Sequence, residues 1–196
     1  MNAKIDLTGV QIPTARLLLR EWREADAADL FAISSQPYAE EMIGRPRHKS
    51  LAEAQQAIAD YAAKKNCFAL QHVQDSKVIG FLELHGSWAA RDPRFAHLSV
   101  TELGTFLAEE YWGGGYAAEA SQAAIDYCFD VLQLGAVAVC HFVTNGQSQR
   151  VVEKLGFRFM QEDSFHSRAL DRDFLERQYI LLREDAADWG FCRPDR

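Results

Sequence analysis

Three consecutive glycines, Gly113 to Gly115, follow a strand-like segment and precede a helix-like one. The first backbone N–H groups of a helix have no partner inside the helix, and the helix dipole favours an anion beside them. Glycines allow a phosphate to approach the backbone because no Cβ stands in the way. Ala117 and Ala118 also keep the first helical turn thin. This order of strand, glycines and helix is typical of a pyrophosphate-binding loop.

Three interpretations of the glycines compete. A tight turn between a strand and a helix also favours glycine. A Rossmann dinucleotide site matches Gly113-x-Gly115-x-x-Ala118 formally, but it needs an acidic residue about 20 positions later. The corresponding window, Gly135 to Cys140, contains none, and no Gly-Lys-Ser/Thr follows the glycines as a Walker loop requires. The third interpretation is a loop for the pyrophosphate of coenzyme A.

The residues around the glycines resemble the signature of the GNAT acetyltransferases. Glu102-Leu103-Gly104 is followed by the run Glu109-Glu110-Tyr111-Trp112-Gly113-Gly114-Gly115-Tyr116-Ala117-Ala118-Glu119-Ala120. The superfamily loop reads Gln/Arg-x-x-Gly-x-Gly/Ala. Trp112 at the Gln/Arg position is typical of the Rim-type (RimJ/RimL-like) branch of ribosomal-protein N-terminal acetyltransferases. That branch usually carries Thr where this chain has Ala118, so the hydroxyl that the Thr would offer to the phosphates is missing here.

Two further blocks resemble the same branch. Residues 145–157 are similar to its pattern Asn-x-x-Ser-x-Arg, an apolar pair, then Glu-Lys-Leu-Gly-Phe. Residues 14–21 resemble its opening, Thr-x-Arg-Leu-x-Leu-Arg, which here leads into Asp26-Ala27. The three blocks occur in the family's order across residues 14–157, so the resemblance covers most of the chain.

The resemblance implies acetyl-CoA as a co-substrate and assigns its binding to the end of a strand, the loop and a second helix. In the family, the Asn contacts the pantetheine arm and the Ser approaches the sulfur, although Asn145 is also a good helix N-cap. Arg150 could reach the adenosine 3′-phosphate or lie on a solvated helix face. The expected acetyl-CoA-binding residues are Phe106, Leu107, Trp112, Gly113, Gly114, Gly115, Tyr116, Ala117, Ala118, Asn145, Ser148 and Arg150.

Acetyl transfer to an amine requires a base, because only the neutral amine is a nucleophile. Glu102, on the strand before the loop, is the leading candidate, acting directly or through a water; a purely structural hydrogen bond is the alternative. Ser148 is the candidate acid for the sulfur, or it orients the thiol. By resemblance, backbone N–H groups of the strand 104–107 stabilise the charge on the thioester oxygen. We expect no acyl-enzyme, because no cysteine has a triad-like context.

The coarse pattern predicts the order β, α, α, βββ, α, β, α, ββ. Strands are expected at 17–22, 67–73, 77–84, 95–108, 136–143, 157–161 and 178–183, and helices at 26–34, 50–65, 116–132 and 145–155. Gly135 is expected to cap the third helix in the left-handed conformation. A kink near Gly104 should separate its strand from the one ending at Val143 and open a cleft. We predict one domain, residues 1–196, with a GNAT-like mixed, mostly antiparallel α/β sheet of six to seven strands and about four helices.

Composition narrows the class of protein. The 196 residues are 48% hydrophobic and 25% charged, with a net charge of −7, which indicates a globular domain with enough apolar material for a core. No basic cluster favours nucleic acid, and no apolar run of about 18 residues predicts a membrane span. The N-terminus lacks a signal peptide, which favours the cytoplasm. The histidines lack metal-ligand spacing, and the cysteines, expected to be buried free thiols, form no close pair: Cys67, Cys128, Cys140 and Cys192.

Together these features predict an N-acetyltransferase that needs no metal. It should move the acetyl group of acetyl-CoA to a primary amine, most simply a protein or peptide N-terminus, by direct attack in a ternary complex. A small-molecule amine of the polyamine, antibiotic or amino-acid type is an alternative acceptor. A non-catalytic acyl-CoA-binding module is an alternative of another class. The assembly is expected to be a monomer or a homodimer.

Overall fold

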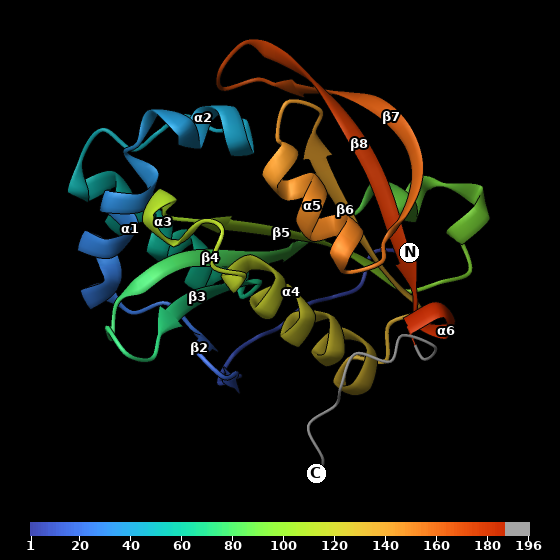
Figure 1. The fold of residues 1–196 in the computed structure, drawn as a ribbon, viewed down its shortest axis with the longest axis horizontal. Coiled ribbons are helices and arrows are strands. Elements are labelled where there is room, and N and C mark those ends of the chain that lie inside the picture. Colours follow the sequence, from blue (N-terminus) through green and yellow to red (C-terminus); the bar gives the residue numbers. More distant parts are fainter. Residues whose placement is uncertain (187–196) are drawn as a thin grey trace.

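The computed structural model describes residues 1–186, which form one eight-stranded sheet with helices on both faces (Figure 1). The strands lie in the order β1-β2-β3-β4-β5-β6-β8-β7. They are β1 (Ile12–Pro13), β2 (Leu17–Arg20), β3 (Cys67–His72), β4 (Val78–His85), β5 (Val100–Leu107), β6 (Ala136–Phe142), β7 (Arg158–Ser167) and β8 (Arg172–Leu182). The α-helices are α1 (Ala27–Ser34), α2 (Pro37–Ile43), α3 (Leu51–Lys64), α4 (Tyr116–Asp126), α5 (Gly146–Lys154) and α6 (Arg183–Ala186).

The predicted mixed, mostly antiparallel α/β sheet is confirmed. Within the described residues β5 and β6 run parallel, and every other neighbouring pair is antiparallel. The sheet has one strand more than the predicted upper limit, because Ile12–Pro13 pairs with β2 as a two-residue edge strand. The short helices α2 and α6 were not expected.

The two faces of the sheet are covered by different helices (Figure 1). On one face, α1 and α3 pack on aromatic and small side chains of the central strands, including Ala69, Phe81 and Phe106. On the other face, α4 and α5 cover an aliphatic layer that includes Leu70 and Leu82. The alternation of side chains along each strand therefore serves two separate cores, as expected for a sheet buried on both sides.

The central strands β5 and β6 diverge. They pair only at their starts, from Val100 opposite Ala136 to Glu102 opposite Ala138. The pairing of β5 with β4 continues without a register shift to Leu107. The predicted separation near Gly104 is thus present without a bulge in the β4–β5 ladder.

Two predictions about the ends of elements were wrong. Residues 95–99 do not belong to β5; Pro93–Phe95 form a 3-10 turn because the Asp92 carboxylate caps it, accepting the Arg94 N–H at 2.8 Å. Gly135 is not the left-handed cap; Gln133 takes that conformation with φ of 55°. Gly135 is needed for a close approach instead, because a Cβ there would lie 2.8 Å from the Leu98 side chain.

The last hairpin is much longer than predicted, since β7 and β8 together extend from Arg158 to Leu182. Most side chains of β7 are exposed, so this edge strand shows little of the apolar alternation by which strands are recognised. The hairpin tip reaches α2, where the Ser167 hydroxyl donates to the Gly44 carbonyl oxygen at 2.7 Å and Arg172 pairs with Glu41.

The described thiols are free. Cys67 and Cys128 are buried and Cys140 is half-buried, while Cys192 lies outside the described residues. Between residues 1 and 186, no helix has the length and apolar character needed to cross a bilayer.

Candidate active site

A cavity of about 680 Å³ lies where β5 and β6 diverge. Its walls come from β4, β5, β6 and β8 and from α2, α4 and α5. The structure brings all but one of the predicted site residues to this cavity, from separate parts of the chain. They are Glu102, Phe106, Leu107, Trp112, Gly113, Gly115, Tyr116, Ala117, Ala118, Asn145, Ser148 and Arg150. Gly114 belongs to the same loop but does not line the cavity.

The glycine loop forms the N-terminal end of α4. Gly113 and Gly115 have φ of 74° and 82°, a left-handed conformation that favours glycine. Helical bonding in α4 begins with the Glu119 N–H, which donates to the Gly115 carbonyl oxygen at 3.0 Å. The N–H groups of the three residues before Glu119 therefore have no partner within the helix. No side chain caps this end, so an anion can occupy the position of the missing cap.

The turn before the loop is held in place by contacts of Trp112 and Tyr38. The Trp112 indole N–H donates to the Leu107 carbonyl oxygen at 3.0 Å, and its ring meets Tyr38 edge-on at 5.0 Å. The Tyr38 hydroxyl accepts the Glu109 N–H at 3.1 Å. These contacts fix the path of the chain from the end of β5 into the glycines.

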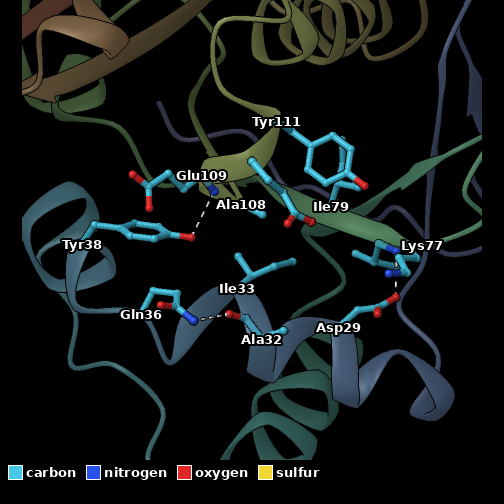
Figure 2. Close-up of a pocket in the computed structure, with 12 residues that line it drawn as sticks. Asp29, Ala32, Ile33, Gln36, Tyr38, Lys77, Ile79, Ala108, Glu109 and Tyr111 are labelled. Atoms are coloured by element: carbon cyan, nitrogen blue, oxygen red, sulfur yellow. Dashed lines mark hydrogen bonds between the residues drawn. The ribbon is translucent and has the colours of Figure 1, made fainter.

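A second cavity of about 520 Å³ adjoins this turn (Figure 2). It lies between α1, the start of α2, the start of β4 and the residues 108–111. Figure 2 shows Tyr38 and Glu109 on one side of this cavity and Asp29 and Lys77 on the other. None of the predicted site residues lines it, so the chemistry of the glycine loop belongs to the larger cavity.

Beyond Glu102, β5 offers an unpaired backbone edge on its β6 side. Unpaired backbone N–H and C=O groups need partners, and an extended polar ligand supplies them in the manner of an added strand. This edge leads from the glycine loop into the interior of the cavity. The resemblance assigns the oxyanion donors to this segment, and that role stays a prediction.

Glu102 is half-buried at the point of divergence. One oxygen, Oε2, accepts the Trp88 backbone N–H at 3.3 Å, so the structural hydrogen bond considered for this residue is present. The carboxyl group also lines the cavity. The two interpretations of Glu102 are therefore compatible, because one carboxylate can both hold a backbone group and face a ligand.

Sequence inspection missed two residues beside Glu102. The Cys140 thiol of β6 lies near Glu102 and Glu176, and both of these carboxyl side chains line the cavity. Burial, with the two nearby negative charges, raises the pKa of Cys140. Burial also raises the pKa of Glu176, as does the charge of Glu102, although Gln178 donates to Glu176 Oε1 at 2.9 Å. No local motif marks Glu176, because β8 joins this cluster only through the folded sheet.

The cavity wall toward α2 combines aromatic and charged side chains. Phe142 and Phe165 stack with ring centroids 5.9 Å apart, near the contact between α2 and the last hairpin. Glu83 in the same wall is buried, with an exposed fraction of 6%, and pairs with Arg45 at 3.0 Å. Glu83 thus has a basic partner, whereas Glu102 and Glu176 form no ion pair among the described residues.

The second predicted helix begins as expected. Asn145 is the N-cap of α5, and its Oδ1 accepts the Ser148 N–H at 3.0 Å. This confirms the N-cap role; contacts of Asn145 and Ser148 with pantetheine stay predictions. Arg150 is exposed at the cavity edge, compatible with either of its two expected roles.

His141 is a hydrogen-bonded core residue. Its two ring nitrogens lie 3.0 Å from the Phe142 carbonyl oxygen and 3.1 Å from the Tyr179 hydroxyl. Burial lowers its pKa. Among residues 1–186, no group of three or more His, Cys, Asp or Glu side chains is arranged to hold a metal ion.

The sequence matches a family model described as the acetyltransferase (GNAT) domain over residues 16–158. An uncharacterized N-acetyltransferase of Bacillus subtilis, YoaA, is 27% identical over 152 residues, which cover 75% of this chain and 82% of the relative. YdaF of the same organism, provisionally named a ribosomal N-acetyltransferase, is 39% identical over 86 residues, covering 43% of this chain and 46% of the relative.

Solved structures share the fold. A GNAT acetyltransferase of Bacillus anthracis superposes with a TM-score of 0.77 at 20% identity, covering 89% of this chain and 99% of that chain. A spermidine N-acetyltransferase of Vibrio cholerae, solved with CoA and spermine, gives 0.71 at 18% identity, covering 89% and 100%. The ribosomal-protein-S5-alanine acetyltransferase of Vibrio fischeri gives 0.68 at 16% identity, covering 90% and 98%.

The family match includes Arg16 of the opening motif, the glycine loop and the Asn145 helix, and the last two of these line the cavity. It spans well over half of the chain. The chain therefore belongs to the GNAT acetyltransferase family and is an N-acetyltransferase that uses acetyl-CoA.

Proposed function

We propose that this enzyme acetylates the N-terminal amine of a protein or peptide by direct attack of the amine on acetyl-CoA. The observation that supports this most is the single cavity at the divergence of β5 and β6. It joins an anion-binding helix end to a pair of carboxylates in one space. Both substrates can therefore be held together, which a direct transfer in a ternary complex requires.

The glycine loop is suited to the pyrophosphate of acetyl-CoA. Free N–H groups at the start of α4 and the helix dipole favour the anion, and no Cβ projects from Gly113 or Gly115. The unpaired edge of β5 is suited to the amide groups of the pantetheine arm. Asn145 and Ser148, at the start of α5, line the same cavity, and by the family resemblance they would meet that arm near its sulfur.

The acceptor amine arrives mostly as an ammonium ion, which the negative wall of Glu102 and Glu176 attracts. Glu102, directly or through a water, takes the proton that the nitrogen must lose. The nitrogen forms a bond to the thioester carbonyl carbon, the C–S bond then breaks, and the thiolate of CoA leaves. Ser148 is placed to orient or protonate this sulfur. No covalent enzyme intermediate is needed.

Two lines of support favour a protein N-terminus as the acceptor. The three sequence blocks resemble the Rim-type branch, and both YdaF and the Vibrio fischeri structure carry names that refer to ribosomal acetylation. A polyamine is the second candidate. The negative wall and the fold shared with a spermidine N-acetyltransferase support it.

Gly113→Glu should abolish acetyl-CoA binding. The new side chain projects from the loop into open space at the cavity and places a negative charge where the pyrophosphate binds. We expect at least about 100-fold weaker binding in calorimetry, because charge-assisted hydrogen bonds are replaced by repulsion. Gly9→Glu is the matched control, since Gly9 has a similar φ of 72° and equally open surroundings. Equal losses in both variants would contradict the assignment of the loop.

Glu102→Gln should reduce kcat by about 10²–10⁴-fold while acetyl-CoA still binds, because a general base contributes about that much. Steady-state kinetics and calorimetry on the same preparation separate the two effects. Glu109→Gln, in the turn outside the main cavity, is the control and should retain activity. Unchanged kcat in Glu102→Gln would remove Glu102 from the mechanism and leave it only the bond to Trp88.

The pH dependence of stability should reveal Glu176. Its pKa is raised in the folded protein, so its stabilising contribution is complete below the unfolded pKa of about 4.3 and is lost as the pH rises through the folded value. Glu176→Gln cannot lose a proton. Its free energy of unfolding should therefore increase relative to the wild type as the pH rises from acid to neutral. Urea unfolding of both proteins at several pH values tests this. If the free energies of unfolding of Glu176→Gln and the wild type differ by the same amount at every pH, the prediction is contradicted.

A panel of amines should identify the acceptor class. We expect peptides with a free N-terminus to have kcat/KM at least about tenfold above spermidine and related polyamines, because specificity is differential binding at the transition state. N-terminally blocked peptides that contain lysine are the control for side-chain acetylation. A preference for polyamines would establish the second candidate. Acetyl-CoA binding without turnover on any amine would contradict both.

A further inference from the structure

The opening motif Thr14-x-Arg16 lies against the glycine loop, although 98 residues separate Arg16 from Gly114 in the sequence. The Arg16 Nη1 group donates to the Gly114 carbonyl oxygen at 2.8 Å. Its Nε donates to Glu119 Oε2 at 2.7 Å, and its Nη2 lies 2.6 Å from the same oxygen. One guanidinium therefore joins the loop to the first turn of α4.

Further contacts fix this guanidinium in place. It stacks over the Tyr116 ring, with Cζ 4.1 Å from the centroid. The other oxygen of Glu119 accepts the Thr14 hydroxyl at 2.6 Å and the Arg16 backbone N–H at 2.8 Å. The segment before β2, the loop and α4 thus form one hydrogen-bonded unit around Glu119.

The bond to Gly114 determines the direction of a neighbouring donor. In a trans peptide the C=O and the following N–H point in opposite directions, and the chain has no cis peptide among its described residues. Because Arg16 holds the Gly114 oxygen, the Gly115 N–H must point away from Arg16. Gly115 lines the cavity and Gly114 does not. This agrees with a peptide unit whose C=O faces Arg16 and whose N–H faces the cavity.

Arg16 also controls the charge beside the loop. Burial raises the pKa of Glu119, but hydrogen bonds from Thr14 and Arg16 more than offset this and hold it below its usual value. Glu119 is therefore ionised near the helix end where an anion should bind. The neighbouring guanidinium offsets this negative charge and leaves the helix dipole available to a ligand.

We infer that Arg16 is a positioning residue for the pyrophosphate of acetyl-CoA. It aims the Gly115 N–H into the cavity and compensates Glu119, without being required for the proton transfer. This inference rests on acetyl-CoA binding at the glycine loop. It gives Arg16 a function within the site, in addition to the place of the opening motif at the start of β2.

The test is calorimetric titration with CoA of the wild type, Arg16→Met, Arg16→Lys and the double variant Arg16→Met with Glu119→Gln. Arg16→Met keeps the aliphatic stem but loses the charge and the donors, and we expect about 10- to 100-fold weaker binding from those losses. Arg16→Lys keeps the charge but lacks the planar fork, so it should fall between Arg16→Met and the wild type. The double variant should bind CoA more tightly than Arg16→Met, because its uncompensated carboxylate is gone.

Two controls separate positioning from general stability. Thr14→Val removes another donor to Glu119 but leaves the Gly114 contact, so it should lower the melting temperature with little change in the Kd for CoA. Under steady-state conditions, Arg16→Met should raise KM for acetyl-CoA and leave kcat nearly unchanged. Wild-type CoA affinity in Arg16→Met, or weaker binding in the double variant than in Arg16→Met, would overturn the inference while leaving the loop assignment intact. Failure of the folded wild type to bind CoA would overturn both.

Discussion

The early separation of β5 from β6 is the constraint on which the rest of the site depends. Parallel pairing holds the two strands together only as far as Glu102 and Ala138. Backbone groups in the middle of a sheet are normally paired, and leaving them unpaired away from water is costly. Here the gap is a cavity open to ligand instead of a packed core. The separation therefore creates a polar edge that a linear, amide-containing substrate can satisfy.

The same separation keeps the positive end of the α4 helix dipole apart from the negative side chains of Glu102 and Glu176. The helix N-terminus and its glycines lie at one part of the cavity, while Glu102 and Glu176 line its wall. A chain with a net charge of −7 must still bind a highly anionic co-substrate. In the proposed binding mode the backbone dipoles at the start of α4 hold the anion, and two nearby acidic groups are paired: Glu119 with Arg16 and Glu83 with Arg45. In the cavity wall, Glu102 and Glu176 form no ion pair among the described residues, and the proposed mechanism brings the cationic amine to them.

Features determined by nearby residues could be predicted from the sequence. The glycine triplet, the Asn145 cap and the β3–β4 hairpin depend on residues a few positions apart, and the structure contains all three. Gly135 was misinterpreted for an instructive reason. A glycine after a helix indicates a left-handed cap. Here Gln133 takes the left-handed conformation, and Gly135 instead leaves room for the side chain of Leu98, which a Cβ at this position would meet. A close approach between distant segments leaves no local pattern.

The parts of the site that the sequence did not reveal are all long-range. Glu176 reaches Glu102 because β8 inserts between β6 and β7, an order that no local periodicity encodes. Arg16 was recognised only as part of a motif, and its contact with Gly114 requires the edge of the sheet to meet the start of α4. Chemistry that depends on one element can thus be anticipated from residue types and spacing. Chemistry that depends on the direction of a single peptide unit, as at Gly114 and Gly115, is determined by a side chain from elsewhere in the fold. In the inference drawn above, the anion site is therefore a property of the loop together with Arg16.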